Sequence, residues 1–387
     1  MVLYLKNKES STMQKTLIVL LLVFLQSFGA PAQSIQKPVQ AKDGIPIGNS
    51  TVLDAGIIAK MEAAITDGTF PNIHSVLIAK SNKLVYEHYW PGKDEIWGNY
   101  KGIVEHAKDS LHDIRSISKS VVSACIGIAI QQGKIKSVDQ RVFEFFPEYE
   151  KLDTGLIAGL TIKHLLTMTS GLKWNEDVPY DNAENSEIKM AFSKNQVEFV
   201  LSQPMDYPPG KSWKYNGGTT QLLAAIIERT TGKKIDEFAG EYLFKPLGIT
   251  KFQWTKYPNT NYPAAASGLR LTSRDLMKFG LLYSQKGKWQ NKQILSVQWV
   301  EDSFKPYTDL PFDGGKYGYQ FWIWPTDFQG KTVNMVTAVG NGDQRIFFNS
   351  ALDVVIVVTA GNYNTWNVQK NALALVREFI NPALIKK

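Results

Sequence analysis

The chain has 387 residues, of which 44% are hydrophobic and 20% charged, a composition that excludes a disordered or collagen-like protein and permits a large packed core. Its single cysteine excludes a disulfide scaffold and a cysteine-rich zinc module. The formal charge of +7 falls to +5 without residues 1–32, which carry three lysines and one glutamate. No dense Lys/Arg run remains, so we expect no nucleic-acid binding.

Residues 1–32 have the pattern of a secretory signal peptide. Lys15 precedes an unbroken apolar run over 16–25, and Ala30 and Ala32 provide an A-x-A cleavage site. The run is shorter than the roughly 20 residues that span a bilayer. We therefore predict cleavage, export to the periplasm or the medium, and no integral membrane span in the mature chain. An uncleaved N-terminal anchor is the alternative, and Met13 is an alternative start.

The mature chain reads as strands at both ends with helices between them. A leader with a helix at 51–67 is expected within residues 33–70, and a single domain is expected over 71–387. Its expected elements are strands at 75–79, 84–89, 332–336, 345–348 and 354–358, with helices at 116–132 and 368–379. This order predicts an α/β (α+β) fold: a central antiparallel sheet built from both chain ends, flanked by helices, with a mostly helical lobe inserted at about 120–260.

Several catalytic and metal-binding motifs are absent from the sequence. There is no G-x-S-x-G, so a nucleophile elbow of the α/β-hydrolase type is excluded. The acidic residues between 176 and 187 lack the D-x-D-x-D-G order of a calcium loop and are interpreted as a solvated loop. No metal and no cofactor is expected, because the five histidines show no ligand spacing. They are His74, His88, His106, His112 and His164.

The motif with the most specific chemistry is Ser116-Ile117-Ser118-Lys119, an S-x-x-K sequence at the start of a long apolar helix. Residues three apart share a helix face, so the Lys119 amine can lie beside the Ser116 hydroxyl. A helix that is apolar on most sides must be buried, and burial favours the neutral amine that can act as a base. Three further copies of the motif fall in expected loops and turns. The alternative role for Ser116 is a simple N-cap.

Two further segments supply candidate site residues. A Pro/Gly turn at 208–210 places Tyr215 on a loop, and a phenol near a lysine can carry a proton to a leaving group. Gly340 and Asn341 end a predicted strand, where glycine permits close approach of a substrate and a backbone N–H can complete an oxyanion hole with the Ser116 N–H. A core or surface tyrosine and an ordinary hairpin turn are the alternatives.

Together these segments resemble the serine β-lactamase and penicillin-binding-protein superfamily, nearest the class C β-lactamase-related branch with its esterases, D-aminopeptidases and nylon-oligomer hydrolases. The resemblance covers roughly residues 70–380. It implies a β-lactamase/transpeptidase-like fold and an acyl-enzyme on Ser116, with Lys119 as base and Tyr215 as proton carrier. Tyr215 matches the first position of the family's Y-x-N motif, and Gly340-Asn341 match the end of its K-T-G-type strand.

Two departures from these motifs bear on the substrate. Gly217 stands where Y-x-N has asparagine, and Ala338-Val339-Gly340 stands where K-T-G has a cation. A charged lactam or D-Ala-D-Ala end loses an interaction worth roughly 1.5–3 kcal/mol without that cation, unless Arg270 or Arg345 replaces it. We therefore expect a serine hydrolase acting on a small ester, amide or peptide-like substrate, with aromatic residues such as Trp322 lining the pocket. The alternatives are a β-lactamase or D-Ala-D-Ala carboxypeptidase, and a non-catalytic binding protein on the same fold. The oligomeric state is left open.

Overall fold

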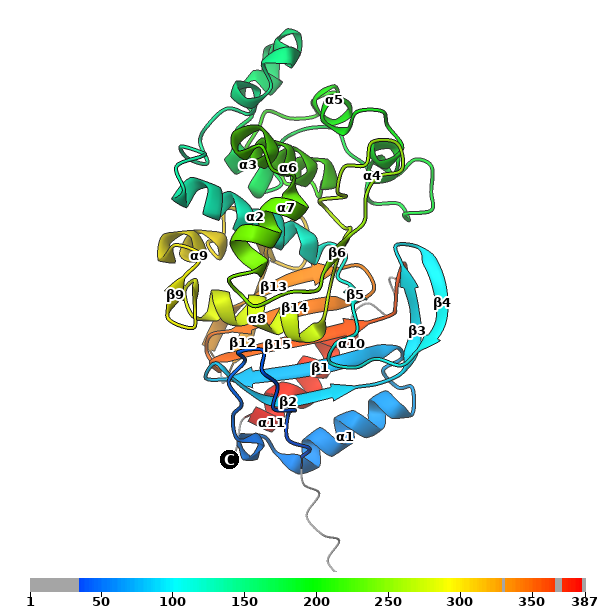
Figure 1. The fold of residues 1–387 in the computed structure, drawn as a ribbon. Coiled ribbons are helices and arrows are strands. Elements are labelled where there is room, and N and C mark those ends of the chain that lie inside the picture. Colours follow the sequence, from blue (N-terminus) through cyan, green and yellow to red (C-terminus); the bar gives the residue numbers. More distant parts are fainter. Residues whose placement is uncertain (1–34, 329–330, 366–370, 385–387) are drawn as a thin grey trace, which may run out of the picture. The chain divides into compact units, whose positions relative to one another are not determined.

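The computed structural model describes residues 35–328, 331–365 and 371–384, and its largest element is a sheet of eight strands. These strands are β1 (Ile73–Lys80), β2 (Lys83–Tyr89), β10 (Thr308–Asp309), β11 (Lys316–Tyr317), β12 (Trp322–Phe328), β13 (Lys331–Gly340), β14 (Gln344–Asn349) and β15 (Val354–Ala360). Their order is β10-β11-β12-β13-β14-β15-β1-β2, and every neighbouring pair is antiparallel (Figure 1).

The pairing of β1 with β15 joins the two ends of the chain. Val76 lies opposite Val358, and Ile78 lies opposite Ile356. The predicted antiparallel sheet, built from both termini and flanked by helices, is therefore confirmed. The signal peptide predicted at 1–32 lies outside the described residues.

The central strands are apolar on both faces because helices cover each face. Alternate side chains point to opposite sides of a strand. On β15, Ile356 and Val358 pack with helix α1 (Ala55–Thr66) and with the C-terminal helices, whereas Val355 and Val357 pack with helix α8 (Ser273–Ser284) (Figure 1). The C-terminal helices are α10 (Asn371–Leu375), the π-helical turn η6 (Val376–Ile380) and α11 (Asn381–Leu384).

Helix α2 (Ile117–Gln131) lies between the sheet and the helical lobe and contacts both β13 and α6. Every residue from Ile117 to Ala129 is buried, as the apolar pattern predicts. The lobe that follows holds α3 (Ile162–Leu166), α4 (Ser186–Ala191), α5 (Gln196–Leu201), α6 (Gly217–Thr231), α7 (Ile235–Ala239) and the π-helical turn η5 (Gly240–Phe244). The 3-10 helices are η1 (Ser50–Val52), η2 (Val142–Phe145), η3 (Pro147–Leu152) and η4 (Gly155–Gly159), and helix α9 (Val297–Ser303) follows α8.

Small sheets complete the fold. They are the hairpin of β3 (Gly92–Ile96) with β4 (Asn99–Val104), the trio of β5 (His112–Asp113), β7 (Leu269–Leu271) and β6 (Gln253–Trp254), and the pair of β8 (Lys288–Trp289) with β9 (Lys292–Gln293). The sequence pattern did not predict the β3–β4 hairpin or β12, since Pro325 interrupts β12 and the hairpin is largely polar. Of the helices in the described part of the chain, none is long and apolar enough to cross a membrane.

Candidate active site

Ser116 and Lys119 lie together at the N-terminal end of α2. Ser116 is the N-cap residue, but its hydroxyl makes no capping hydrogen bond and is therefore available for another partner. That partner is Lys119, whose Nζ lies 3.1 Å from the Ser116 Oγ. Lys119 is 1% exposed, and its Nζ also donates to the carbonyl oxygen of Ala266 at 3.0 Å. The helical spacing of three residues thus produces the predicted contact between the amine and the hydroxyl.

Tyr215 brings a phenol to the same point from the loop before α6. Its side chain lies beside the Ser116 hydroxyl on the wall of one cavity, and the Lys119 Nζ lies 4.9 Å from the centre of its ring. The loss of solvent around the hydroxyl and the nearby Glu176 carboxyl raise the pKa of Tyr215 well above its usual range. The phenol therefore keeps its proton at neutral pH. The protonated phenol can donate a proton and take up another, but the side chain is not present as a phenolate that could act as a base by itself.

Two buried carboxyl groups lie beside this trio, where a solvated loop was expected. Asp177, Asp181 and Glu184 are exposed as predicted. Glu176 and Glu187 are only 6% and 5% exposed, so the solvated-loop interpretation is wrong for these two residues. The local composition gave no sign of their burial. Glu176 is buried because its loop folds back over the N-terminus of α6, whereas Glu187 lies in the first turn of α4 and its Oε1 accepts from the Ser267 hydroxyl at 2.7 Å.

Glu176 is held by three donors. Its Oε1 accepts from the Gly217 N–H at 2.5 Å and from the Trp174 indole at 2.5 Å, and its Oε2 accepts from the Tyr180 hydroxyl at 3.0 Å. Burial and the neighbouring Glu187 raise the pKa of Glu176 to about 8, although the charge of Lys119 acts in the opposite direction. A substantial fraction of Glu176 is therefore protonated at neutral pH.

This pair of acids explains the departure at Gly217. A Cβ at Gly217 would lie 2.6 Å from the Glu187 Oε2 and 3.0 Å from the Glu176 Oε1. An asparagine side chain therefore has no room at this position, because the carboxyl groups occupy its space. Gly217 is the first residue of α6 and contributes its N–H to Glu176, so it shapes the site through its backbone.

Gly340 and Asn341 meet the segment that leads into Ser116. Gly340 ends β13, and a Cβ there would lie 2.2 Å from the carbonyl oxygen of Ile114, so only glycine permits this close approach. The Asn341 side chain is hydrogen-bonded to Asn364, because its Nδ2 donates to the Asn364 Oδ1 at 2.7 Å. Ser116 and Asn341 line the same two cavities, as the predicted oxyanion pair requires.

Ser116 opens onto two adjoining cavities of different character. The smaller, of about 390 Å³, has an aromatic wall of Trp213, Tyr215, Phe312 and Trp322. None of its lining residues in the described chain is a lysine or an arginine. The larger, of about 810 Å³, extends past Arg115 and Glu95 toward the β3–β4 hairpin and α4. The site thus offers separate space on two sides of a carbonyl held at Ser116.

The two arginines considered as substitutes for the missing strand cation are engaged elsewhere. The Arg270 Nε pairs with the Asp113 Oδ1 at 2.7 Å, and its Nη1 donates to Gln253. The Arg345 Nε pairs with the Asp343 Oδ1 at 3.1 Å. Neither side chain lines the cavities at Ser116. Two cations that the sequence analysis did not propose line the larger cavity. Arg115 immediately precedes the serine and pairs with Glu95 and Asp113, and Lys256 lies elsewhere on the cavity wall.

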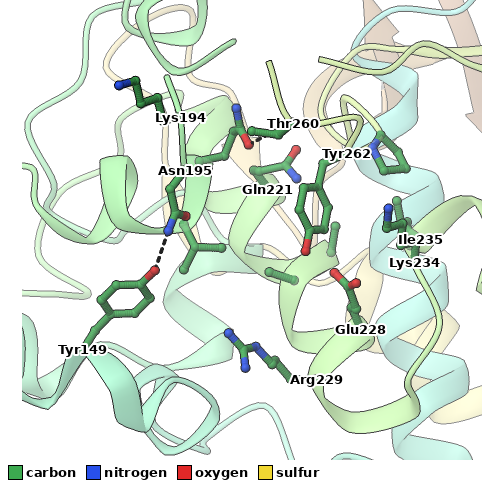
Figure 2. Close-up of a pocket in the computed structure, with 15 residues that line it drawn as sticks. Tyr149, Lys194, Asn195, Gln221, Glu228, Arg229, Lys234, Ile235, Thr260 and Tyr262 are labelled. Carbon is green, nitrogen blue, oxygen red and sulfur yellow. Dashed lines mark hydrogen bonds between the residues drawn. The ribbon is translucent and has the colours of Figure 1, made fainter. Parts of the chain in front are cut away.

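A third cavity lies within the helical lobe and is separate from Ser116. It has a volume of about 230 Å³, and Figure 2 shows Tyr149, Asn195, Glu228 and Arg229 around it. The Asn195 Nδ2 donates to the Tyr149 hydroxyl at 2.6 Å. Ser116, Lys119 and Tyr215 are not among its lining residues. We assign it no role in the chemistry at the serine.

Comparison with known proteins agrees with this geometry. Residues 61–377 match the family model described as Beta-lactamase. The 6-aminohexanoate-dimer hydrolase of Paenarthrobacter ureafaciens is 25% identical over 299 residues, which cover 73% of this chain and 70% of that protein. The lovastatin esterase of Penicillium rubens is 30% identical over 142 residues, but these cover only 34% of this chain and 32% of the esterase. The solved structure of the octameric penicillin-binding protein homologue from Pyrococcus abyssi shares the fold, with a TM-score of 0.61 at 20% identity, and the match covers 83% of this chain and 77% of that one.

Proposed function

This chain belongs to the beta-lactamase family and is a serine hydrolase, and from that premise we propose that it cleaves a small, uncharged ester or amide through an acyl-enzyme on Ser116. The observation that carries the proposal is the 3.1 Å contact between the Lys119 Nζ and the Ser116 Oγ at the junction of two cavities.

The chemistry follows from the protonation states of the three groups. The Ser116 Oγ attacks the substrate carbonyl carbon, and Lys119, when uncharged, accepts the serine proton. The Tyr215 phenol, whose pKa is raised, holds its own proton and can pass it to the leaving oxygen or nitrogen while it takes one from Lys119. The bond to the leaving group breaks and an ester to Ser116 remains. Water then attacks this ester with the same groups acting in reverse, which releases the acid and restores the serine.

The oxyanion formed during both steps requires backbone donors. We propose the N–H groups of Ser116 and Asn341 for this role, since Ser116 is the N-cap residue of α2, Asn341 follows β13, and both line the same cavities. Mutational loss of such a donor in other hydrolases costs about 3–4 kcal/mol of transition-state stabilisation, so their placement determines much of the rate.

The character of the smaller cavity supports an uncharged substrate. Its aromatic wall favours an apolar group, and its two acidic lining residues, Glu176 and Asp177, offer no positive charge to a substrate carboxylate. A substrate carboxylate in this cavity would meet no lysine or arginine among the described residues. The similarity to a 6-aminohexanoate-dimer hydrolase and to an esterase supports the amide and ester classes.

A fluorophosphonate probe tests the nucleophile. We expect the probe to attach to Ser116 of the mature protein and the Ser116→Ala variant to lose both labelling and turnover of p-nitrophenyl esters. Ser123→Ala is the matched control, because Ser123 is another buried serine of α2 that lines neither cavity at the nucleophile. Labelling that persists in Ser116→Ala would show that the nucleophile is another residue.

The second candidate function is a β-lactamase or D-Ala-D-Ala carboxypeptidase, which the 26% identity over 191 residues to a putative D-alanyl-D-alanine carboxypeptidase of Escherichia coli favours. A chromogenic cephalosporin and a D-Ala-D-Ala peptide distinguish it from the first. We expect slow or absent turnover of both relative to the uncharged esters. A higher kcat/KM for either charged substrate would favour the second function.

We also propose that the protein is exported. The proposal rests on the basic, apolar and A-x-A pattern of residues 1–32. Cell fractionation with N-terminal sequencing tests it, and we expect the mature chain to begin near residue 33. A cytoplasmic protein that retains residues 1–32 would contradict export.

A further inference from the structure

Three of the five histidines gather with one aspartate at a place that does not line the cavities at Ser116. His74 lies on β1, Asp94 on β3, His106 after β4 and His112 on β5. One nitrogen or oxygen of each side chain lies within 4.8 Å of the corresponding atom of every other member. His74, Asp94 and His112 are 5% exposed or less, and His106 is half-buried. The cluster thus joins four chain segments that are separate in sequence.

The hydrogen bonds of His112 orient its ring toward the centre of the cluster. Its Nδ1 lies 3.0 Å from the Asp113 carbonyl oxygen, which can only accept, so the Nδ1 carries the proton. The Nε2 lone pair then faces the His74 Nδ1 at 2.8 Å and lies 3.8 Å from the Asp94 Oδ1. A ring nitrogen that donates to a backbone carbonyl while the other nitrogen faces inward is the arrangement typical of a metal-bound histidine.

Asp94 is held in a similar way. Its Oδ1 accepts from the Tyr363 hydroxyl at 3.2 Å and from the Glu95 N–H at 2.9 Å. Among the described residues, no lysine or arginine pairs with this buried carboxyl group; its one ion-pair partner is His112. A buried carboxylate without a cation is costly. A cation at the centre of the cluster would remove this cost.

His106 contributes a ring nitrogen to the cluster that has no hydrogen-bond partner among the described residues. Its Nε2 is buried and makes no hydrogen bond to a described residue. Its ring stacks on that of His74, with centroids 4.0 Å apart. A buried ring nitrogen without a hydrogen-bond partner is available to bind a metal ion.

We propose that His74, Asp94, His106 and His112 bind one divalent transition-metal ion, and that Zn²⁺ is the ion this ligand set fits. Three imidazoles and one carboxylate match the nitrogen and oxygen ligands of tetrahedral zinc sites. Zinc–nitrogen bonds of about 2.0–2.1 Å place tetrahedral ligand atoms ~3.3 Å apart. The present separations reach up to 4.8 Å, so binding draws the ligands together, chiefly through the half-buried His106.

Four protein ligands leave no open position for a substrate, so the ion has a structural role. It would tie the β3–β4 hairpin to β1 of the main sheet and to the segment that leads into Ser116. Glu95, next to the ligand Asp94, pairs with Arg115, next to the nucleophile. Glu95 and Arg115 both line the larger cavity. The ion would thereby fix one wall of the substrate site.

Metal content and binding test the proposal directly. Tag-free mature protein is stripped with a chelator and titrated with Zn²⁺ by calorimetry, with mass spectrometric metal analysis and Co²⁺ absorption as second readouts. We expect one equivalent of Zn²⁺ per chain, a rise in Tm on binding and the visible absorption of tetrahedral Co²⁺. In His106→Asn and Asp94→Asn we expect affinity at least tenfold weaker. His88→Gln is the matched control, since His88 is a partly exposed histidine outside the cluster that contacts Glu62.

The wild-type protein decides the outcome even where a variant fails to fold. Absence of stoichiometric Zn²⁺ binding at micromolar free ion, with no change in Tm, would overturn the proposal. Unchanged affinity in folded His106→Asn or Asp94→Asn, or an equal loss in His88→Gln, would overturn it as well. None of these results depends on catalytic activity.

Discussion

The raised pKa of the buried Glu176 carboxyl predicts how the free energy of unfolding depends on pH. Its pKa is raised from an ordinary 4.5 to about 8 in the folded protein, chiefly by burial and by Glu187. Between these two pH values the folded state holds a proton that the unfolded state has released. Stability therefore falls as pH rises through this window, at up to ~1.4 kcal/mol per pH unit. Across the ~3.5 units between the two values the loss is at most about 5 kcal/mol.

Glu176→Gln removes this titration while it preserves the hydrogen bonds. The glutamine oxygen can accept from the Gly217 N–H and the Trp174 indole, as the Glu176 Oε1 does. Its amide can donate to the Tyr180 hydroxyl, which then rotates to accept. We therefore expect the variant to match the wild type near pH 5 and to become more stable than the wild type by about 2–5 kcal/mol at pH 9.

Urea unfolding at pH 5, 7 and 9, followed by circular dichroism, measures this difference. Glu184→Gln is the matched control, because Glu184 is an exposed acid in the same loop. We expect the control to follow the wild-type pH dependence. If Glu176→Gln has the same pH dependence as the wild type, then Glu176 is ionised in the folded protein and the assignment of a raised pKa is wrong.

Three further predictions concern α2 and the residues around it. Lys119→Met should lower kcat/KM by about 10²–10⁴-fold at neutral pH, because the proton acceptor is lost, and the circular dichroism spectrum should not change. Lys134→Met is the surface control. Equal activity of the two variants would exclude Lys119 from the reaction. Gly217→Ala should destabilise the protein by about 1–3 kcal/mol in urea unfolding, because the added Cβ would lie 2.6 Å from the Glu187 Oε2. Gly159→Ala is the control and should change stability little, because a Cβ there meets no atom within 4 Å. Equal effects of the two substitutions would contradict the close packing of Gly217 against Glu187. The Cys125 thiol is fully buried, and burial raises its pKa. A disulfide reagent should therefore label Cys125 only after the protein unfolds. Fast labelling of the native protein would show that α2 opens readily.

The local sequence pattern determined which segments form the central helix and strands and which residues of α2 meet at the active site. The spacing of Ser116 and Lys119 and the apolar composition of the residues after them predict a buried helix with an amine beside a hydroxyl, and both features depend on contacts within one helical turn. The β-branched runs near the two chain ends likewise predict strands. These features follow from the period of the secondary structure, which adjacent residues specify.

The tertiary structure decided the rest. Glu176 and His106 each lie in segments that read as ordinary polar loop, and nothing in their neighbours along the chain distinguishes them from exposed residues. Glu176 is buried because its loop packs against Gly217, 41 residues away. His74 meets His112 across 38 residues, since β1 and β5 converge only in the folded chain. Burial and ligand clustering depend on contacts between distant segments, and sequence spacing alone does not record such contacts.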